Sequence, residues 1–210
     1  MKYSIIVFDI DGTLIDTEFA VLNSLKESIY DLKGINYSPH ELKFALGIPS
    51  GEALKKLGIE DDKLQEAYDL WNDNFSKYIP EIKLFSGILD LIQSLYNRGI
   101  PLALLTSKDE LEMKNDFLPL GIMKYFKYTV TAESTKKHKP HPEPMLKILE
   151  MACYKPGEAV YIGDSIYDMQ CANSAGVDCI LALWSREGVD GIEATYYAKA
   201  PKDVWNIINS

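Results

Sequence analysis

The stretch that decides the fold reads Tyr3-Ser4-Ile5-Ile6-Val7-Phe8-Asp9-Ile10-Asp11-Gly12-Thr13. Its first half is a continuous run of β-branched and aromatic residues, which is typical of a strand buried on both faces. Two aspartates end the run, and Gly12 permits a tight turn after them. From Thr17 the apolar residues follow helical spacing, so the Asp-Gly pair does not have the second strand that a hairpin would need.

Residues 16–81 show only helical patterns. Ser38-Pro39 is a typical helix start, a further helix is expected near Ser50, and a longer one over 61–78. Beyond residue 82 the pattern alternates between helices and strands, with strands predicted at 101–105, 128–131, 159–162 and 179–183 and helices at 86–99, 109–118, 142–152, 167–175 and 201–208. Such alternation predicts an α/β fold, a Rossmann-like parallel sheet with helices on both faces. Residues 1–15 and 82–210 would form this core, and residues 16–81 an inserted all-α cap.

Bulk properties narrow the function classes. The chain has 210 residues and a net charge of −9, without a basic stripe, which argues against nucleic acid or an anionic membrane as a partner. No apolar run approaches the length of a membrane span. Its three cysteines show no metal-ligand spacing. We therefore expect a cytoplasmic protein with reduced thiols, a monomer or weak dimer that acts on a small molecule.

Chemically active side chains follow three of the predicted strands. Asp9 ends the first, Thr106 and Ser107 follow the second, and Asp164 follows the fourth, with Asp168 in the next helical turn. In an open parallel sheet these positions meet at one edge, where ligands bind. Together with Asp11 they would bring up to four carboxylates together, which requires a counter-ion. Oxygen ligands of this kind select Mg²⁺, and Thr106 or Ser107 could donate a hydroxyl to a phosphate.

Each motif alone also has a plain structural explanation. Asp164 or Ser165 could be the N-cap of a helix, Thr106-Ser107 is a routine N-cap pair, and Asp168 would be favoured by the dipole of a helix start. The lysine-rich segment around Lys139 could be a solvated loop, and Lys137 is a second candidate for a phosphate-binding lysine. His138 and His141 have no partner at zinc-ligand spacing. Because the motifs occur together, we interpret them as parts of one ligand-binding site.

Taken in order, these motifs resemble those of the haloacid dehalogenase-like (HAD) superfamily. The matching residues are Asp9-x-Asp11-Gly12-Thr13, Thr106 at a strand end, Lys139-Pro140 and Gly163-Asp164-x-x-x-Asp168. The helical insert after the first motif is similar to the small cap of that superfamily. The subgroup it most resembles contains phosphoglycolate phosphatases and pyrophosphatases.

The resemblance implies a role for each residue. Asp9 would be the nucleophile that forms an aspartyl-phosphate, and Asp11 would be the general acid and then the general base. Thr106 and Lys139 would hold the phosphoryl oxygens. Asp9, the main chain of Asp11, Asp164 and Asp168 would hold Mg²⁺, with Asp168 bound directly or through water.

The cap segment Gly47-Ile48-Pro49-Ser50 is similar to the loop that sets substrate specificity in the subgroup, although it could be an ordinary helix connection. The cap contains no arginine that could clamp a carboxylate or a second phosphate, which weakens the case for phosphoglycolate.

We therefore expect a Mg²⁺-dependent phosphatase acting on a small phosphorylated metabolite. An inorganic pyrophosphatase is the alternative. A sugar-phosphate mutase is less favoured because residues 16–21 lack the histidine usual in that group. The non-enzymatic alternatives are a signalling module that accepts a phosphoryl group on Asp9 and a scaffold that has lost activity.

Overall fold

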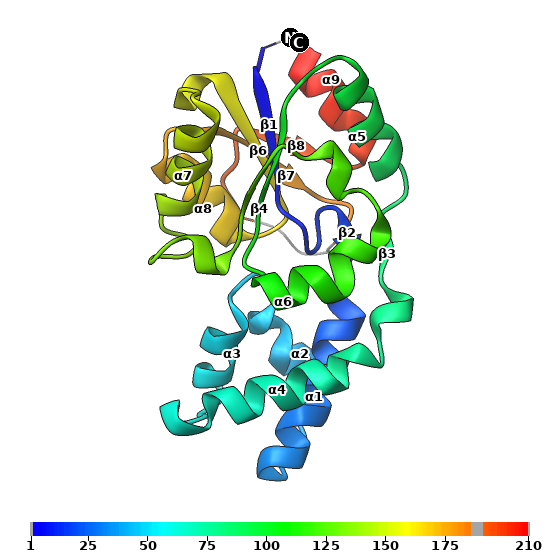
Figure 1. The fold of residues 1–210 in the computed structure, drawn as a ribbon, viewed down its shortest axis with the longest axis vertical. Coiled ribbons are helices and arrows are strands. Elements are labelled where there is room, and N and C mark those ends of the chain that lie inside the picture. The colour runs from blue at the N-terminus through cyan, green and yellow to red at the C-terminus, as the bar shows by residue number, and fades with distance from the viewer. Residues whose placement is uncertain (1, 186–190, 210) are drawn as a thin grey trace.

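The computed structural model describes residues 2–185 and 191–209. Figure 1 shows an α/β core with a helical cap below it and both chain ends at the far side of the core. The predicted fold class is confirmed.

The core is built on a sheet of six parallel strands in the order β5-β4-β1-β6-β7-β8. Strand β1 lies in the middle and pairs with β4 on one side and β6 on the other, which brings the carboxyl ends of all three to one edge. The strands are β1 (Ile5–Phe8), β4 (Leu102–Leu105), β5 (Tyr128–Val130), β6 (Ala159–Gly163), β7 (Asp178–Ala182) and β8 (Tyr196–Ala198).

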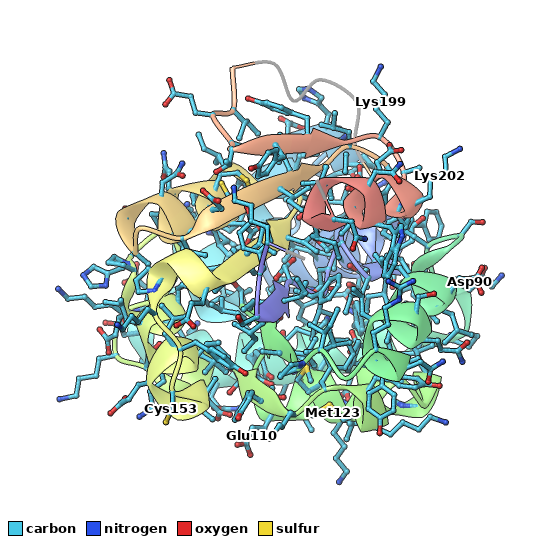
Figure 2. The ribbon with its side chains drawn as sticks, turned by 90° about the horizontal axis from the view of Figure 1, so that it is seen from above. Asp90, Glu110, Met123, Cys153, Lys199 and Lys202 are labelled. Carbon is cyan, nitrogen blue, oxygen red and sulfur yellow. The ribbon has the colours of Figure 1, made fainter. Side chains whose placement is uncertain are left out.

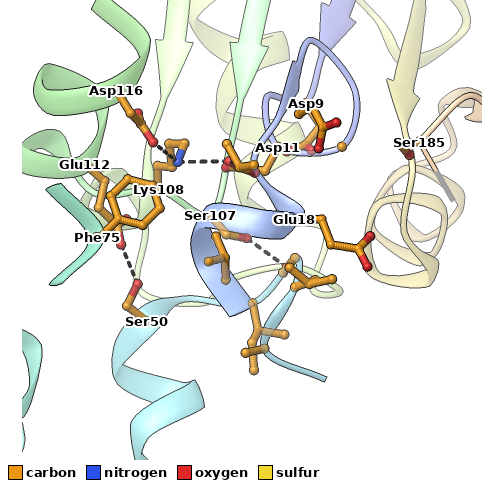
Figure 3. Close-up of a pocket in the computed structure, with 18 of the residues that line it drawn as sticks. Asp9, Asp11, Glu18, Ser50, Phe75, Ser107, Lys108, Glu112, Asp116 and Ser185 are labelled. Atoms are coloured by element: carbon orange, nitrogen blue, oxygen red, sulfur yellow. Dashed lines mark hydrogen bonds and ion pairs between the residues drawn. The ribbon is translucent and has the colours of Figure 1, made fainter. Parts of the chain in front are cut away.

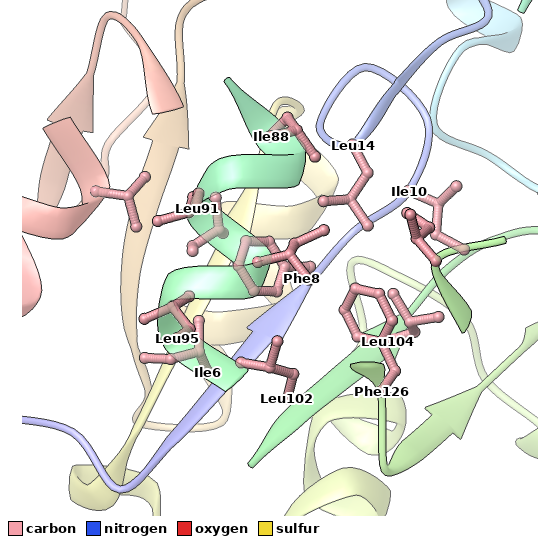
Figure 4. Close-up of a cluster of buried hydrophobic side chains, with 14 of the residues drawn as sticks. Ile6, Phe8, Ile10, Leu14, Ile88, Leu91, Leu95, Leu102, Leu104 and Phe126 are labelled. Atoms are coloured by element: carbon pink, nitrogen blue, oxygen red, sulfur yellow. The ribbon is translucent and has the colours of Figure 1, made fainter. Parts of the chain in front are cut away.

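Helices cover both faces of the sheet. On one face lie α5 (Ile88–Asn97) and α9 (Pro201–Asn209), and on the other α7 (Glu143–Ala152) and α8 (Ile166–Ser174). Figure 2 shows the two pairs, green and red against yellow and gold, on opposite sides of the strands. The strands are apolar throughout because both of their faces are buried. Phe8, Leu104 and Leu91 of α5, for example, belong to one of the two core clusters (Figure 4).

The cap has a hydrophobic core of its own, centred on residues such as Leu25, Leu54 and Trp71. It consists of α1 (Glu18–Lys33), α2 (Pro39–Leu42), α3 (Ser50–Lys56) and α4 (Leu64–Ser76). The chain enters it through β2 (Ile15–Asp16) and leaves it through β3 (Lys83–Leu84), which pair antiparallel. The two chain connections between cap and core therefore lie side by side.

Short 3₁₀ turns connect several of these elements. They span Lys43–Ala45, Asp61–Lys63, Ile79–Glu81, Leu118–Leu120, Met123–Tyr125, Ala132–Ser134 and Pro156–Glu158.

The segment 109–118 differs from the single helix expected there. It forms α6 (Glu110–Glu112), a π-helical turn (Met113–Phe117) and then a 3₁₀ turn. Pro119 explains the change, because it has no N–H and its ring would clash with the carbonyl of Asn115 in a continuing α-helix. Strand β8 and the β2–β3 pair were also not predicted.

Candidate active site

Three strands deliver the predicted residues to one edge of the sheet. Asp9 follows β1, Thr106 follows β4 and Asp164 follows β6, and all three are buried. Because β1 pairs in register with both neighbours, the three positions lie side by side. Thr106 here accepts a hydrogen bond from the backbone N–H of Lys108 at 3.1 Å.

The carboxylates of Asp9, Asp164 and Asp168 form a compact buried cluster, with oxygen atoms that lie within 4.8 Å of one another. Two glycines leave the room for it. A Cβ on Gly12 would lie 2.1 Å from Oδ2 of Asp164, and one on Gly163 would lie 2.5 Å from Cβ of Asp168. Three buried hard oxygen donors with this spacing fit a divalent cation such as Mg²⁺.

Lys139 reaches into the acidic cluster from the loop before α7. Its Nζ lies 2.7 Å from Oδ1 of Asp9 and 2.7 Å from Oδ1 of Asp168. Lys137 lies outside the cluster, since it is exposed and contacts His141 instead. His138 and His141 take no part in the cluster.

Tyr161, on β6, supports this arrangement from below. Its fully buried hydroxyl donates to Oδ1 of Asp168 at 2.8 Å and lies 3.0 Å from the carbonyl oxygen of Leu105 and 3.3 Å from Nζ of Lys139. This role could not be predicted from the pattern, because Tyr161 stands in an apolar strand where an aromatic residue is expected for packing.

Asp168 occupies the third position of α8, where it completes a capping box with Ser165. Ser165 Oγ accepts from the backbone N–H of Asp168, and Oδ2 of Asp168 accepts from the backbone N–H of Ser165. This reciprocal bond fixes the rotamer of Asp168. The helix cap that offered a plain explanation of the motif is thus present, and it holds Asp168 in the cluster.

The electrostatics of the cluster show a surplus of negative charge around Asp9. Burial raises the pKa of Asp9 well above its ordinary value, and the charges of Asp168, Asp164 and Asp11 raise it further, while Lys139 lowers it. For Asp168 burial acts in the same direction, but Lys139, Ser165 and Tyr161 outweigh it, so its pKa is lowered. Lys139 offsets only part of this rise in the pKa of Asp9, and an added cation would favour the charged form.

Asp11 lies outside this cluster. Its Oδ1 accepts from the hydroxyl of Thr17 at 2.7 Å and lies 2.9 Å from Nζ of Lys108. Figure 3 shows its side chain turned toward Lys108. Lys108 is only 7% exposed and also contacts Oδ2 of the buried Asp116 at 2.6 Å.

The segment after β4 makes polar contacts with the cap. The hydroxyl of Ser107 donates to the carbonyl of Gly47 at 3.1 Å, and Ser50 donates to Glu112 (Figure 3). Tyr68 of α4 donates to Asp109 in the same way. In this conformation the Ser107 hydroxyl therefore serves the contact between cap and core.

A pocket of about 880 Å³ lies between cap and core, above the acidic cluster. Asp9, Asp11 and Lys139 line its base. From the predicted specificity loop Gly47, Ile48 and Ser50 line it, whereas Pro49 does not.

Sequence reasoning missed Lys108, Glu112 and Asp116 as pocket residues. The signal available for Lys108 was its place directly after the Thr106-Ser107 pair at a strand end. Glu112 and Asp116 are four residues apart, a spacing that puts them on one face of a helical segment.

None of the helices in the described parts of the chain has the length and apolarity that crossing a bilayer requires.

Comparison with known proteins adds the following. The sequence model of haloacid dehalogenase-like hydrolases matches residues 6–182. A Clostridium perfringens protein named as a proposed pyrophosphatase, PpaX, is 32% identical over 172 residues, covering 81% of this chain and 79% of that one. Pyrophosphatase PpaX of Anoxybacillus flavithermus is 26% identical over 197 residues, covering 93% and 90%. The crystal structure of a proposed phosphoglycolate phosphatase from Lactobacillus plantarum superposes with a TM-score of 0.89 at 28% identity, covering 99% and 100%.

Proposed function

Since this chain belongs to the haloacid dehalogenase-like hydrolases and is a phosphatase of that family, we propose that it hydrolyses a small phosphomonoester with Mg²⁺ and through an aspartyl-phosphate on Asp9. One observation carries the proposal. Asp9 stands buried at the carboxyl end of the central strand, within 4.8 Å of two further carboxylates and 2.7 Å from a buried lysine. Carboxylates are not gathered in this way for packing.

Asp9 is the proposed nucleophile. One of its carboxylate oxygens would attack phosphorus while the ester oxygen leaves, which forms an acyl phosphate and splits hydrolysis into two easier steps. Lys139 is already beside Asp9 and would hold an oxygen of the transferring group, with the hydroxyl of Thr106 as a second donor. Asp168 and Tyr161 keep Lys139 in place for this task.

Asp11 is the proposed acid and base. It would donate a proton to the leaving oxygen and then take one from the water that hydrolyses the acyl phosphate. Thr17 and Lys108 hold its carboxylate at the pocket wall, so it must turn toward the substrate to act. Because Thr17 lies at the start of the cap, rotation of the Asp11 side chain is coupled to the position of the cap.

Asp9, Asp164 and Asp168 would hold the metal ion, together with the main chain of Asp11 as the family resemblance implies. When bound, Mg²⁺ would neutralise charge on Asp9 and on the phosphoryl oxygens. The raised pKa of Asp9 supports this part of the proposal, because a nucleophilic carboxylate must be ionised and a bound cation would lower that pKa.

An inorganic pyrophosphatase is the second candidate. The observation in its favour is the similarity to the two relatives named as pyrophosphatases, at 32% and 26% identity. The same Asp9 chemistry would serve it, with phosphate as the leaving group.

The test is a phosphate-release assay with phosphomonoesters and pyrophosphate, each with Mg²⁺ and with a strong chelator, alongside intact-mass measurement after rapid quenching. We expect release only with Mg²⁺, and a transient phosphoryl adduct that peptide mapping assigns to Asp9. Full activity in the chelator, or an adduct on another residue, would contradict the proposal.

A further inference from the structure

The pocket above Asp9 and Asp11 has an aromatic wall contributed by the cap. Tyr68, Trp71, Asn72 and Phe75 of α4 all line it. They stand at positions i, i+3, i+4 and i+7, so they share one face of the helix. Trp71 is fixed by a hydrogen bond of 2.9 Å from its indole nitrogen to Ser24. This wall offers apolar contact and one amide, but no charge.

The pocket is also lined by several acidic side chains. Beyond Asp9 and Asp11, the side chains of Asp16, Glu18, Glu112 and Asp116 line it. Glu18 has an exposed partner in Lys43 at 3.1 Å, and Glu112 accepts a hydrogen bond from Ser50. Burial raises the pKa of Glu112 to about 7, so part of its charge persists at neutral pH.

The lysines of the pocket are already engaged. Among the lining residues that the structure describes, the cations are Lys108 and Lys139. Lys139 contacts Asp9 and Asp168, and Lys108 contacts Asp11 and Asp116, in each case within 2.9 Å. Lys139 belongs to the transferring phosphoryl group. An anionic leaving group would have to take Lys108 from Asp11 and from the buried Asp116, at a cost in desolvation and lost pairing.

We propose that this pocket selects phosphomonoesters whose leaving group carries no negative charge and presents an apolar or aromatic face to α4. The inference rests on the proposed phosphatase function and deepens it. It places pyrophosphate and phosphoglycolate among the poorer substrates, because a second anion would face the carboxylates of the wall. Specificity of this kind arises from repulsion as much as from attraction.

The experiment compares two substrates of the same shape that differ in one charge, 4-carbamoylbenzyl phosphate and 4-carboxybenzyl phosphate. Their ester oxygens and ring systems match, so the ratio of their kcat/KM values reports the charge of the leaving group. A carboxylate on the leaving group would be repelled by the like charges that line the pocket, so we expect the amide to be favoured about tenfold. Pyrophosphate and phosphoglycolate are measured in the same assay and should fall below the amide.

A variant tests the same wall from the side of the protein. Asn72→Arg adds a cation to the aromatic face and should lower the ratio toward one, by improving the carboxylate substrate. Asn97→Arg is the matched control, because Asn97 is an exposed residue of α5 in the core, and it should leave the ratio unchanged. Circular dichroism checks that both variants fold. If Asn72→Arg does not fold, the ratio of kcat/KM values for the wild-type protein decides the matter.

The possible results distinguish failure of the inference about the leaving group from failure of the proposed phosphatase function. Hydrolysis of both benzyl phosphates with equal efficiency, or with a preference for the carboxylate, overturns the inference and leaves the phosphatase function standing. Absence of phosphate release from every substrate in the presence of Mg²⁺ overturns the proposed function, and the inference with it.

Discussion

The ammonium group of Lys108 lies 2.9 Å from the carboxylate of Asp11 and is 7% exposed. This buried pair connects the segment after β4 to the residue that we propose as acid and base. Lys108 also contacts Asp116, whose Oδ2 lies 2.6 Å from its Nζ. The ends of two neighbouring strands are thus held together by one cation.

Replacing Lys108 by Met should lower the free energy of unfolding by about 3–5 kcal/mol, because Asp116 then remains buried without its cation. Adding Asp116→Asn should recover at least half of that loss. Urea denaturation measures both. Lys147→Met is the control, since Lys147 forms an exposed pair with Glu150 and should cost no more than about 1 kcal/mol. If Lys108→Met lowered the free energy of unfolding no more than the control does, the buried contact of Lys108 with Asp116 would not stabilise the protein.

Asp9→Asn should abolish phosphate release and leave the fold intact, as judged by circular dichroism. Burial raises the pKa of Asp9, so a neutral side chain at this position removes a cost of folding in the absence of metal. We therefore expect a thermal midpoint in chelator no lower than that of the wild type. Activity near the wild-type level would refute Asp9 as the nucleophile.

Asp11→Ala should still transfer the phosphoryl group from an activated aryl ester but hydrolyse the adduct slowly. The reason is that a good leaving group needs no proton, whereas the attacking water still needs a base; the loss is expected to be about 10²–10⁴-fold. Intact-mass spectrometry should then show an accumulating adduct. A protein that turns over without one would require another base.

Gly12→Ala should weaken Mg²⁺ binding, because its Cβ would overlap Oδ2 of Asp164 at 2.1 Å. Gly34→Ala is a matched control: both glycines have a positive φ, 74° and 67°, but Gly34 has open space around it. Titration of activity and of the thermal midpoint with Mg²⁺ should show an affinity about 10–100-fold lower for Gly12→Ala alone. Equal effects in both variants would mean that only the backbone conformation matters.

The stability of the protein should depend on pH through Glu112. Burial raises the pKa of Glu112 from 4.5 to about 7, although Lys108 opposes the shift, so the folded protein holds this proton more tightly than the unfolded chain. The stability that this proton contributes is present below pH 4.5 and is lost as the pH rises through 7.

Glu112→Gln keeps the side chain neutral at every pH. We expect it to match the wild type near pH 5 and to exceed it at pH 8 by roughly 1–3 kcal/mol in the free energy of unfolding. Chemical denaturation at the two values measures this. Glu110→Gln, on the exposed side of the same helix, should show no such difference. A constant gap across the pH range would assign the effect to packing.

The sequence predicted the parts of the fold whose pattern is long and strongly apolar. Strands β1, β4 and β6 are continuous apolar runs because both of their faces are buried. Strand β8 has three residues at the sheet edge and is only partly buried, and β2 and β3 have two residues each, too few for a periodicity to emerge. Their positions depend on tertiary pairing, which composition does not encode.

The same contrast holds for the site. Asp9, Thr106 and Asp164 were predictable because each directly follows a strand, and topology alone brings strand ends together. Lys139 comes from a loop, and only the family resemblance favoured it over Lys137. Tyr161 and Asp116 act from positions where their residue types have ordinary explanations, so the pattern alone does not mark them as part of the site.

The pairing of Ile15 with Leu84 has a practical meaning for protein engineering. Residues opposite each other in an antiparallel pair lie about 5 Å apart, so the two ends of the cap can be joined by a tight turn without stretching the chain. A shortened protein lacking the intervening segment would keep the six-stranded sheet and the acidic cluster. It would offer a minimal scaffold onto which lids of other chemistry could be grafted.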